Sequence, residues 1–399
     1  MMKEFACLVC ETLALELVHG FETLPRVTSD CKPFERGGRL FACGHCGAIQ
    51  KTPDAVWLSE IDRIYRGYEI YQLSQGTEQL IFSGDGAAAA RSNLLVDFMM
   101  ANAKLPLTGR LIDIGCGNGA ALANFSAALP RWELYGSELS DKGTDGLKRL
   151  PNFKQLFTVL LGQIPGTFNL VSMIHSLEHM LSPSAALAEA AGLLTGEGAL
   201  LVEVPDVETS PFDLVVADHL MHFSVSTLGY LASQCDLRPS FLANTLLPKE
   251  ITLLAKKGNS GNQTQLSLIS PAAAERGKEV AEGTVKWLGE VVSTATAMAD
   301  TGAPFGIFGT SISGMWRYGS LRHRVDFFVD EDTTRIGRKY EGKPIFNPQE
   351  APAGSNVYIP LAPSIARKVV DRLSVERARF VAPPPFAGAS AQSSRVQHR

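Results

Sequence analysis

The chain has 399 residues, a formal net charge of −4 and 45% hydrophobic side chains, enough apolar material for two or three domains. Without an excess of positive charge it lacks the field that holds nucleic acid or an anionic membrane surface, so neither is an expected partner. Its apolar runs are shorter than the roughly 18–20 residues of a membrane-spanning helix, and its N-terminus lacks the apolar core of a signal peptide. We therefore expect a cytoplasmic protein, whose oligomeric state the sequence leaves open.

Four of the seven cysteines form two C-x2-C pairs within the first 46 residues. These cysteines are Cys7, Cys10, Cys43 and Cys46. Four thiolates brought together at about 2.3 Å from one ion form the closed tetrahedral shell of structural zinc. The pattern predicts a zinc-binding domain, a zinc ribbon, over residues 1–58, with Cys31 and His45 as bystanders. The alternative is four unrelated thiols that bind no metal.

Residues 59–105 have a helical and mixed pattern and carry three tyrosines at spacings of three. Tyr65, Tyr68 and Tyr71 would lie roughly along one face if this stretch were a single helix. We predict a helical connector between two domains that presents aromatic side chains.

Between residues 106 and 258, short β-like runs alternate with segments rich in alanine and leucine. The predicted strands are Arg110–Ile114, Glu133–Glu138, Leu170–Ile174, Ala199–Val204 and Ile251–Ala255. Strand–helix alternation at this spacing is typical of an α/β fold, with a parallel sheet covered on both faces by helices.

A glycine-rich turn follows the first predicted strand, in the order Asp113, Gly115, Gly117 and Gly119 at alternate positions. Glycine lets the backbone approach a ligand closely, and the helix that follows offers unpaired N–H groups. Glu138 ends the next strand, where its carboxylate can accept both hydroxyls of an adenosine ribose. The alternative is a nicotinamide-dependent enzyme, whose fingerprint has the spacing G-x-G-x-x-G rather than G-x-G-x-G.

The loop beyond the strand Ala199–Val204 contains Asp218-His219 and, three residues later, His222. Open α/β folds bind substrates at loops of this kind, beyond the carboxyl ends of the strands. An Asp-His pair there can remove a proton near neutral pH, with the carboxylate orienting or charging the imidazole. The alternatives are two histidines that bind a metal or cap a helix, or a loop with a structural role only.

A smaller C-terminal α/β domain is predicted over residues 259–380, beginning with a long helix at Pro271–Thr301. Its predicted strands are Phe305–Phe308, Val325–Val329 and Asn356–Ile359. A glycine turn with Gly309 and a strand that leads to Asp330 form a half-Rossmann-like arrangement, which can hold a nucleotide phosphate at a helix N-terminus. The alternative is a domain that only braces the core. Residues 381–399, rich in proline, alanine, serine and glutamine, predict a disordered tail.

The Asp-x-Gly-x-Gly-x-Gly turn, the acid at Glu138 and the later strand that leads to His175 resemble the class I S-adenosylmethionine-dependent methyltransferases. The resemblance implies a Rossmann-like core with S-adenosyl-L-methionine as cofactor, held by the glycine loop and Glu138. It also implies that Ile174 and His175 lie beside the cofactor. Asn169 departs from the family, which commonly has an aspartate before this strand.

The order of the modules, together with the motif Asp218-His219-Leu-x-x-Phe-Ser224, resembles the nucleotide-sugar C-methyltransferases of deoxysugar biosynthesis over residues 5 to about 375. The resemblance implies that His219 is the catalytic base, that Asp218, Tyr68 and Tyr71 line the sugar site, and that the C-terminal domain helps to bind the nucleotide-sugar. The residues expected to contact this small-molecule substrate are His222, Gly309 and Asp330.

The function that this resemblance implies is transfer of a methyl group to the carbon beside the ketone of a nucleotide-linked keto-deoxysugar. His219 would remove the proton from that carbon and generate an enolate. One alternative is methylation of a hydroxyl or amine of a sugar or a related small molecule. Another is a non-catalytic binding module, in which the cofactor fold serves as a scaffold.

Overall fold

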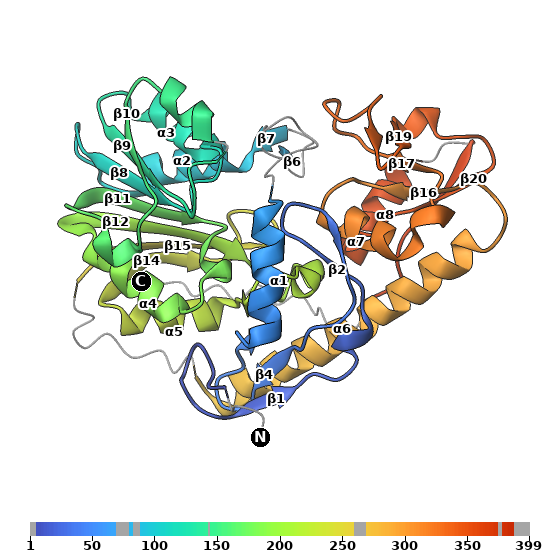
Figure 1. The fold of residues 1–399 in the computed structure, drawn as a ribbon, viewed down its shortest axis with the longest axis horizontal. Coiled ribbons are helices and arrows are strands. Elements are labelled where there is room, and N and C mark those ends of the chain that lie inside the picture. Colours follow the sequence, from blue (N-terminus) through green and yellow to red (C-terminus); the bar gives the residue numbers. More distant parts are fainter. Residues whose placement is uncertain are drawn as a thin grey trace.

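The computed structural model describes residues 5–68, 80–82, 88–142, 144–258, 269–373 and 377–386. Figure 1 shows a central domain on the left, a C-terminal domain on the right and an N-terminal module below and between them. Within the described part of the chain, no helix is both long enough and apolar enough to cross a membrane.

The N-terminal module is built on a small antiparallel sheet that borrows its last strand from the central domain. Its strands are β1 (Leu15–Leu17), β4 (Phe41–Cys43), β5 (Ile49–Gln50) and β13 (Met221–His222), in the order β1-β4-β5-β13. A separate two-stranded ribbon consists of β2 (Arg26–Val27) and β3 (Pro33–Phe34). We call the loop that contains Asp218, His219 and His222 the histidine loop. Because β13 carries His222, the N-terminal module directly holds part of this loop.

The predicted connector contains two helices separated by a two-stranded ribbon. These elements are α1 (Ala55–Arg66), β6 (Leu80–Phe82), β7 (Ala88–Ala90) and α2 (Arg91–Asn102). The Asp54 carboxylate caps the first helix by accepting from the Trp57 N–H at 2.9 Å, so that helix begins before the predicted boundary at residue 59. The second helix packs on the central domain through Leu95 and Met99.

The central domain has a seven-stranded sheet in the order β10-β9-β8-β11-β12-β15-β14. Its strands are β8 (Arg110–Ile114), β9 (Glu133–Ser137), β10 (Phe153–Phe157), β11 (Phe168–Ile174), β12 (Leu194–Pro205), β14 (Leu237–Ala243) and β15 (Glu250–Lys257). The pairs among the first five are parallel, whereas β15 runs antiparallel to both of its neighbours. The predicted α/β fold with a Rossmann-like core is confirmed.

Helices cover both faces of this sheet (Figure 1). The helices are α3 (Ala120–Ala128), α4 (Pro183–Gly192) and α5 (Val225–Gln234). Successive strand residues point to opposite faces, so Leu111 packs with α2 and α3 while its neighbour Ile112 packs with α4 and α5. Burial on both faces explains why these strands read as continuous apolar runs.

The C-terminal domain contains a six-stranded sheet in the order β18-β19-β17-β16-β20-β21. Its elements are α6 (Pro271–Ala299), β16 (Phe305–Phe308), α7 (Ile312–Leu321), β17 (Phe327–Val329), β18 (Lys339–Tyr340), β19 (Lys343–Phe346), β20 (Ser355–Tyr358), α8 (Pro363–Arg372) and β21 (Ala378–Val381). Part of the predicted tail is ordered, because β21 extends to Val381 and the Trp287 indole donates to the Pro384 carbonyl at 3.0 Å. Residues 387–399 lie outside the described part.

The long helix α6 joins the C-terminal domain to the N-terminal module (Figure 1). The helix backbone lies so close to the second cysteine pair that a Cβ atom added at Gly277 would be 2.1 Å from the Gly47 carbonyl oxygen. A second contact between the C-terminal domain and the N-terminal module is the hydrogen bond that the Trp316 indole of α7 donates to the Pro25 carbonyl at 2.6 Å. The N-terminal module is therefore packed against both of the other domains.

Candidate active site

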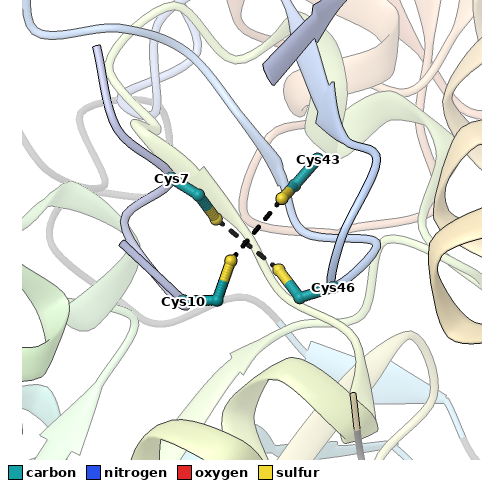
Figure 2. Close-up of side chains that lie close together, drawn as sticks. All are labelled: Cys7, Cys10, Cys43 and Cys46. Atoms are coloured by element: carbon teal, nitrogen blue, oxygen red, sulfur yellow. Dashed lines mark hydrogen bonds between the residues drawn. The ribbon is translucent and has the colours of Figure 1, made fainter. Parts of the chain in front are cut away.

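The four predicted cysteine ligands come together at one point. The Sγ atoms of Cys7 and Cys46 are 3.5 Å apart, those of Cys10 and Cys43 are 3.6 Å apart, and all four lie within 4.8 Å of one another. Figure 2 shows the four side chains converging on a common centre. Four sulfurs at about 2.3 Å from a tetrahedral ion would be about 3.8 Å apart, so this cluster fits Zn²⁺ and is closed to a substrate.

This cysteine module also supports the histidine loop. Strand β13 pairs with β5, with His222 opposite Ile49, and the Lys51 N–H donates to the Leu220 carbonyl at 2.8 Å. The cysteines share one hydrophobic core with Met221 and Phe223, which flank His222. We therefore expect a loss of order in the N-terminal module to reach this loop.

A cavity of about 380 Å³ opens where all three parts of the chain meet. The central domain contributes its glycine loop, the end of β11 and the histidine loop. The N-terminal module contributes Ser29 and Cys31, and the C-terminal domain contributes the start of α7. The cavity lies beyond the carboxyl ends of β8 and β11, the switch point at which open parallel sheets bind ligands.

The glycine loop has the backbone conformation that its sequence requires. The φ angles of Gly115, Gly117 and Gly119 are 75°, 54° and 86°, in the left-handed region that favours glycine. A Cβ atom at Gly115 would also lie 2.5 Å from the Ser176 side chain, and one at Gly119 would lie 2.2 Å from Leu147. The loop can therefore bring its backbone against a ligand in the cavity.

Two acids flank this loop. Asp113 is buried at the end of β8, where it accepts a hydrogen bond from the Ser172 hydroxyl at 2.7 Å. Glu138 follows β9, and its carboxylate accepts from the Gly117 and Leu139 N–H groups at 2.7 and 2.9 Å. These residues fit S-adenosylmethionine. The half-buried Glu138 carboxylate can accept hydrogen bonds from the ribose hydroxyls, and the left-handed glycine loop beside it can approach the part of the cofactor that carries the sulfonium.

Asn169, the departure from the family pattern, has a local structural role. Its side-chain oxygen accepts from the Arg110 N–H at 2.9 Å. Arg110 begins β8 and Asn169 lies near the start of β11. The contact is therefore at the amino ends of these strands, whereas the cavity lies at their carboxyl ends. The missing aspartate does not alter the cavity wall.

Ile174 and His175 line the cavity at the end of β11. The His175 ring lies between two carboxylates, with Nδ1 3.3 Å from Glu178 and Nε2 3.3 Å from Glu250. Burial lowers its pKa, but these two carboxylates more than offset burial and raise the pKa of His175 to about 10. Arg91 also pairs with Glu250, at 2.7 Å.

His219 lines the cavity, and its orienting carboxylate is Asp213 rather than the neighbouring Asp218. His219 Nδ1 is 2.6 Å from one Asp213 oxygen, and His222 Nδ1 is 2.6 Å from the other. A carboxylate only accepts, so in the neutral His219 ring Nδ1 carries the proton and Nε2 is available as a base. Asp213 belongs to the 3₁₀ helix Pro211–Val215, six residues before His219.

His222 is buried behind His219 instead of lining the cavity. Its Nε2 is 3.1 Å from Lys51 Nζ, which also donates to the carbonyl oxygens of Val216 and His219 at 2.7 Å each. Burial and the Lys51 charge lower the pKa of His222 to about 4, which keeps this ring neutral. His222, which was expected to contact the substrate, is not among the residues that line this cavity, and it shares the Asp213 carboxylate with His219.

Burial alone would lower the pKa of His219, but the Asp213 carboxylate reverses this effect and raises the pKa of His219 above its ordinary value. The Asp213 pKa is held far below its usual range, because the two histidines outweigh the effect of burial. This buried carboxylate therefore stays ionised while His219 gains and loses its proton.

Ser29 and Tyr68 line the N-terminal wall of the cavity, and Asp218 is buried behind them. Asp218 accepts from the Ser29 N–H at 2.8 Å, and Ser29 Oγ lies 3.0 Å from the Tyr68 hydroxyl. Burial, followed by the Asp218 charge, raises the Tyr68 pKa well above its usual value, so this hydroxyl remains a donor. Tyr71 lies outside the described residues.

The C-terminal wall is formed by Thr310, Ser311 and Ser313 at the start of α7, together with Arg335. Gly309 has a φ of 83° in the turn that leads into this helix. Asp330 lies behind the wall, where it accepts from the Thr310 N–H and hydroxyl at 3.1 and 2.7 Å. The groups that face the cavity here are thus hydroxyls, a helix N-terminus and a guanidinium.

A protein-family model described as a methyltransferase domain matches residues 87–238. These residues form a methyltransferase domain. The match covers less than half of the chain and includes α2, the glycine loop, the end of β11 and the histidine loop. The match supports an enzyme that transfers methyl groups, and the glycine loop and Glu138 fit S-adenosylmethionine as the methyl donor.

Solved methyltransferases share part of this fold at low identity. An S-adenosylmethionine-dependent methyltransferase from Clostridium acetobutylicum is 11% identical, covering 51% of this chain and 98% of its own, with a TM-score of 0.36. The plantazolicin methyltransferase BpumL, solved with SAH, is 12% identical over 42% of this chain and 82% of its own, with a TM-score of 0.36. Curated protein sequences include no match to this chain.

Sequence reasoning missed three side chains of this methyltransferase site. Asp213 and Lys51 hold the two histidines, and Glu178 lies against His219 with almost no exposure. The nearest available signal was the spacing of Asp213 six residues before His219, which is not a helical or strand repeat. Lys51 is 168 residues from His219 and gave no signal at all.

Proposed function

We propose that this methyltransferase alkylates the carbon beside the ketone of a nucleotide-linked keto sugar. The observation that carries the proposal is that the His219–Asp213 pair and the glycine loop line the same cavity. An imidazole base in a cofactor cavity suits an acceptor whose C–H must be deprotonated, and a ketone makes the adjacent C–H acidic enough for histidine.

The proposed reaction assigns separate tasks to three side chains. His219 Nε2 removes the proton from the carbon, and Asp213 stabilises the imidazolium that forms. The Tyr68 hydroxyl, with its raised pKa, donates to the enolate oxygen. When bound, S-adenosylmethionine would supply an electrophilic methyl group. The enolate carbon would form its new bond to that methyl group as the bond from methyl to sulfur breaks, so that S-adenosylhomocysteine leaves and the imidazolium keeps the proton.

The C-terminal wall supports the assignment of a nucleotide-linked substrate. The first N–H groups of α7 and the Arg335 guanidinium are the groups that bind phosphate oxygens. Gly309 shapes the turn into this helix, and Asp330 orients Thr310 and lies 3.6 Å from Arg335. In this proposal both residues support the phosphate site rather than contact the sugar.

The product decides between carbon methylation and the alternatives. The enzyme is incubated with S-adenosylmethionine carrying a ¹³C methyl group and a panel of nucleotide-linked 4-keto sugars, and the products are analysed by NMR. We expect a new ¹³C methyl group bonded to the carbon beside the carbonyl. A methyl group on oxygen or nitrogen would refute the proposal and select the alternative chemistry on a hydroxyl or amine.

Replacing Asp213 by asparagine should change the pH dependence as well as the rate. The Asp213 charge raises the pKa of His219, so the wild-type rate should increase with pH through a midpoint above 6.5. Without that charge, burial dominates, and the midpoint should move to lower pH while the maximal rate falls by about 10²–10⁴-fold. The pH profile of kcat measures both effects, and an unchanged midpoint would show that Asp213 does not act on the base.

A further inference from the structure

One side of the cavity carries three side chains that could bind a metal ion, and the proposed reaction uses only one of them. One donor atom each from Glu178, His179 and His219 lies within 4.8 Å of the others. Glu178 and His179 come from the 3₁₀ helix Leu177–His179 after β11, and all three residues line the cavity.

Glu178 is the unusual member of this group. Its side chain is 1% exposed, and among the residues that the structure describes none donates a hydrogen bond to either of its carboxylate oxygens. His175 Nδ1 lies 3.3 Å from Glu178 Oε1 and offsets part of the cost of burying this carboxylate. A metal ion in the cavity would coordinate carboxylate oxygens that accept no hydrogen bond in the described part of the chain.

The two histidines are held in the tautomer that metal binding requires. His179 Nδ1 is 3.0 Å from the Asp218 carbonyl oxygen, which only accepts, and 3.1 Å from the Tyr65 hydroxyl, which can accept as well as donate. A proton on Nδ1 satisfies both contacts and leaves Nε2 its lone pair. His219 Nδ1 is fixed in the same way by Asp213. Metal-binding histidines typically donate their second N–H to a carboxylate or a backbone carbonyl, as both rings do here.

We propose that Glu178, His179 and His219 bind a divalent first-row transition-metal cation. Two imidazoles and one carboxylate on one side of an open cavity are a known donor set for such ions, with the remaining positions free for water or an acceptor oxygen. The nearby group of Asp213, His219 and His222 is a poorer candidate, since both Nδ1 atoms already contact Asp213 and Lys51 Nζ lies 3.1 Å from His222 Nε2. The carboxylates of Asp213 and Asp218 add negative charge around the proposed ion.

The inference goes beyond the proposed function. A cation on His219 Nε2 takes up the lone pair that the proposed reaction uses as its base, so the metal-bound form is unable to deprotonate the sugar. We expect added Mn²⁺ to inhibit carbon methylation. The site itself is tested by binding alone, without cofactor or acceptor, so failure of the site and failure of the proposed function are distinguishable.

The test is a titration of the full-length, zinc-loaded protein with Mn²⁺, followed by electron paramagnetic resonance of the free ion. Mn²⁺ favours carboxylate and other oxygen ligands over thiolate, so the cysteine cluster keeps its zinc. The wild type should bind one Mn²⁺ per chain, and Glu178→Gln should weaken binding at least tenfold. Glu203→Gln is the matched control, because Glu203 is also a buried carboxylate but lies outside the donor group, and it should bind Mn²⁺ like the wild type.

A second measurement needs no variant and so does not depend on how a substitution folds. Electron spin-echo envelope modulation of Mn²⁺ bound to the wild type should show coupling to two imidazole nitrogens. Absence of Mn²⁺ binding, absence of nitrogen coupling, or Glu178→Gln binding as tightly as the wild type would each overturn the proposal.

Discussion

Replacing His219 by asparagine is expected to abolish methyl transfer while leaving cofactor binding intact. The imidazole lines the cavity opposite the glycine loop, and the N–H groups of that loop are unaffected by its loss. Removal of a general base typically costs about 10²–10⁴-fold in rate. Turnover of an NMR-identified acceptor measures the loss, and calorimetry with S-adenosylmethionine measures the retained binding. His19→Asn, at an exposed histidine of the N-terminal module, is the control and should keep full activity.

A second readout isolates proton removal from methyl transfer. With S-adenosylhomocysteine in the cofactor site and the keto sugar in D₂O, the wild type should exchange the proton beside the ketone for deuterium. His219→Asn should exchange no faster than the uncatalysed reaction. Exchange at the wild-type rate in this variant would assign the base to another residue.

Loss of zinc from the cysteine cluster should reduce activity as severely as loss of the His219 base. Structural zinc contributes on the order of 10 kcal/mol of binding free energy in small domains, comparable with the roughly 5–15 kcal/mol net stability of a whole domain. We expect Cys46→Ser to lose zinc, to unfold at lower temperature and to lose activity, because the histidine loop pairs with this module through β13 and β5. Metal analysis, calorimetry and the methyl-transfer assay measure the three effects.

The control for this prediction is Cys235→Ser. Cys235 is buried away from the cluster, and its thiol donates to the Ser184 carbonyl, a bond that serine can also make. This variant should keep its zinc and its activity. If Cys46→Ser kept wild-type melting temperature and activity without metal, the cluster would have no structural role.

The sequence predicted those parts of the fold that depend on local pattern. The apolar run Arg110–Ile114 and the strand Phe305–Phe308 have the predicted bounds, because strands buried on both faces read as short apolar blocks. The strands Phe153–Phe157 and Leu237–Ala243 were missed. Both lie at edges of the sheet, where alternating exposure breaks the apolar run.

The site was predictable only where its residues lie close together in the sequence. The glycine loop and Glu138 follow from one strand–helix–strand unit, in which the backbone conformation dictates the residue type. The partners of the histidines come from distant segments, as the contact between Lys51 and His222 shows. Local spacing favoured Asp218 as the orienting acid, whereas the fold turns that side chain toward Ser29 and brings in Asp213.

The central claim is that the methyl donor and the His219 imidazole share one cavity. A crystal structure of the protein with S-adenosylhomocysteine and a keto-sugar nucleotide tests it most directly. We predict ribose hydroxyls on Glu138, the sulfur beside the glycine loop and the sugar carbon between that sulfur and His219 Nε2. A cofactor bound elsewhere, or a sugar on the side of the cofactor away from His219, would contradict the account.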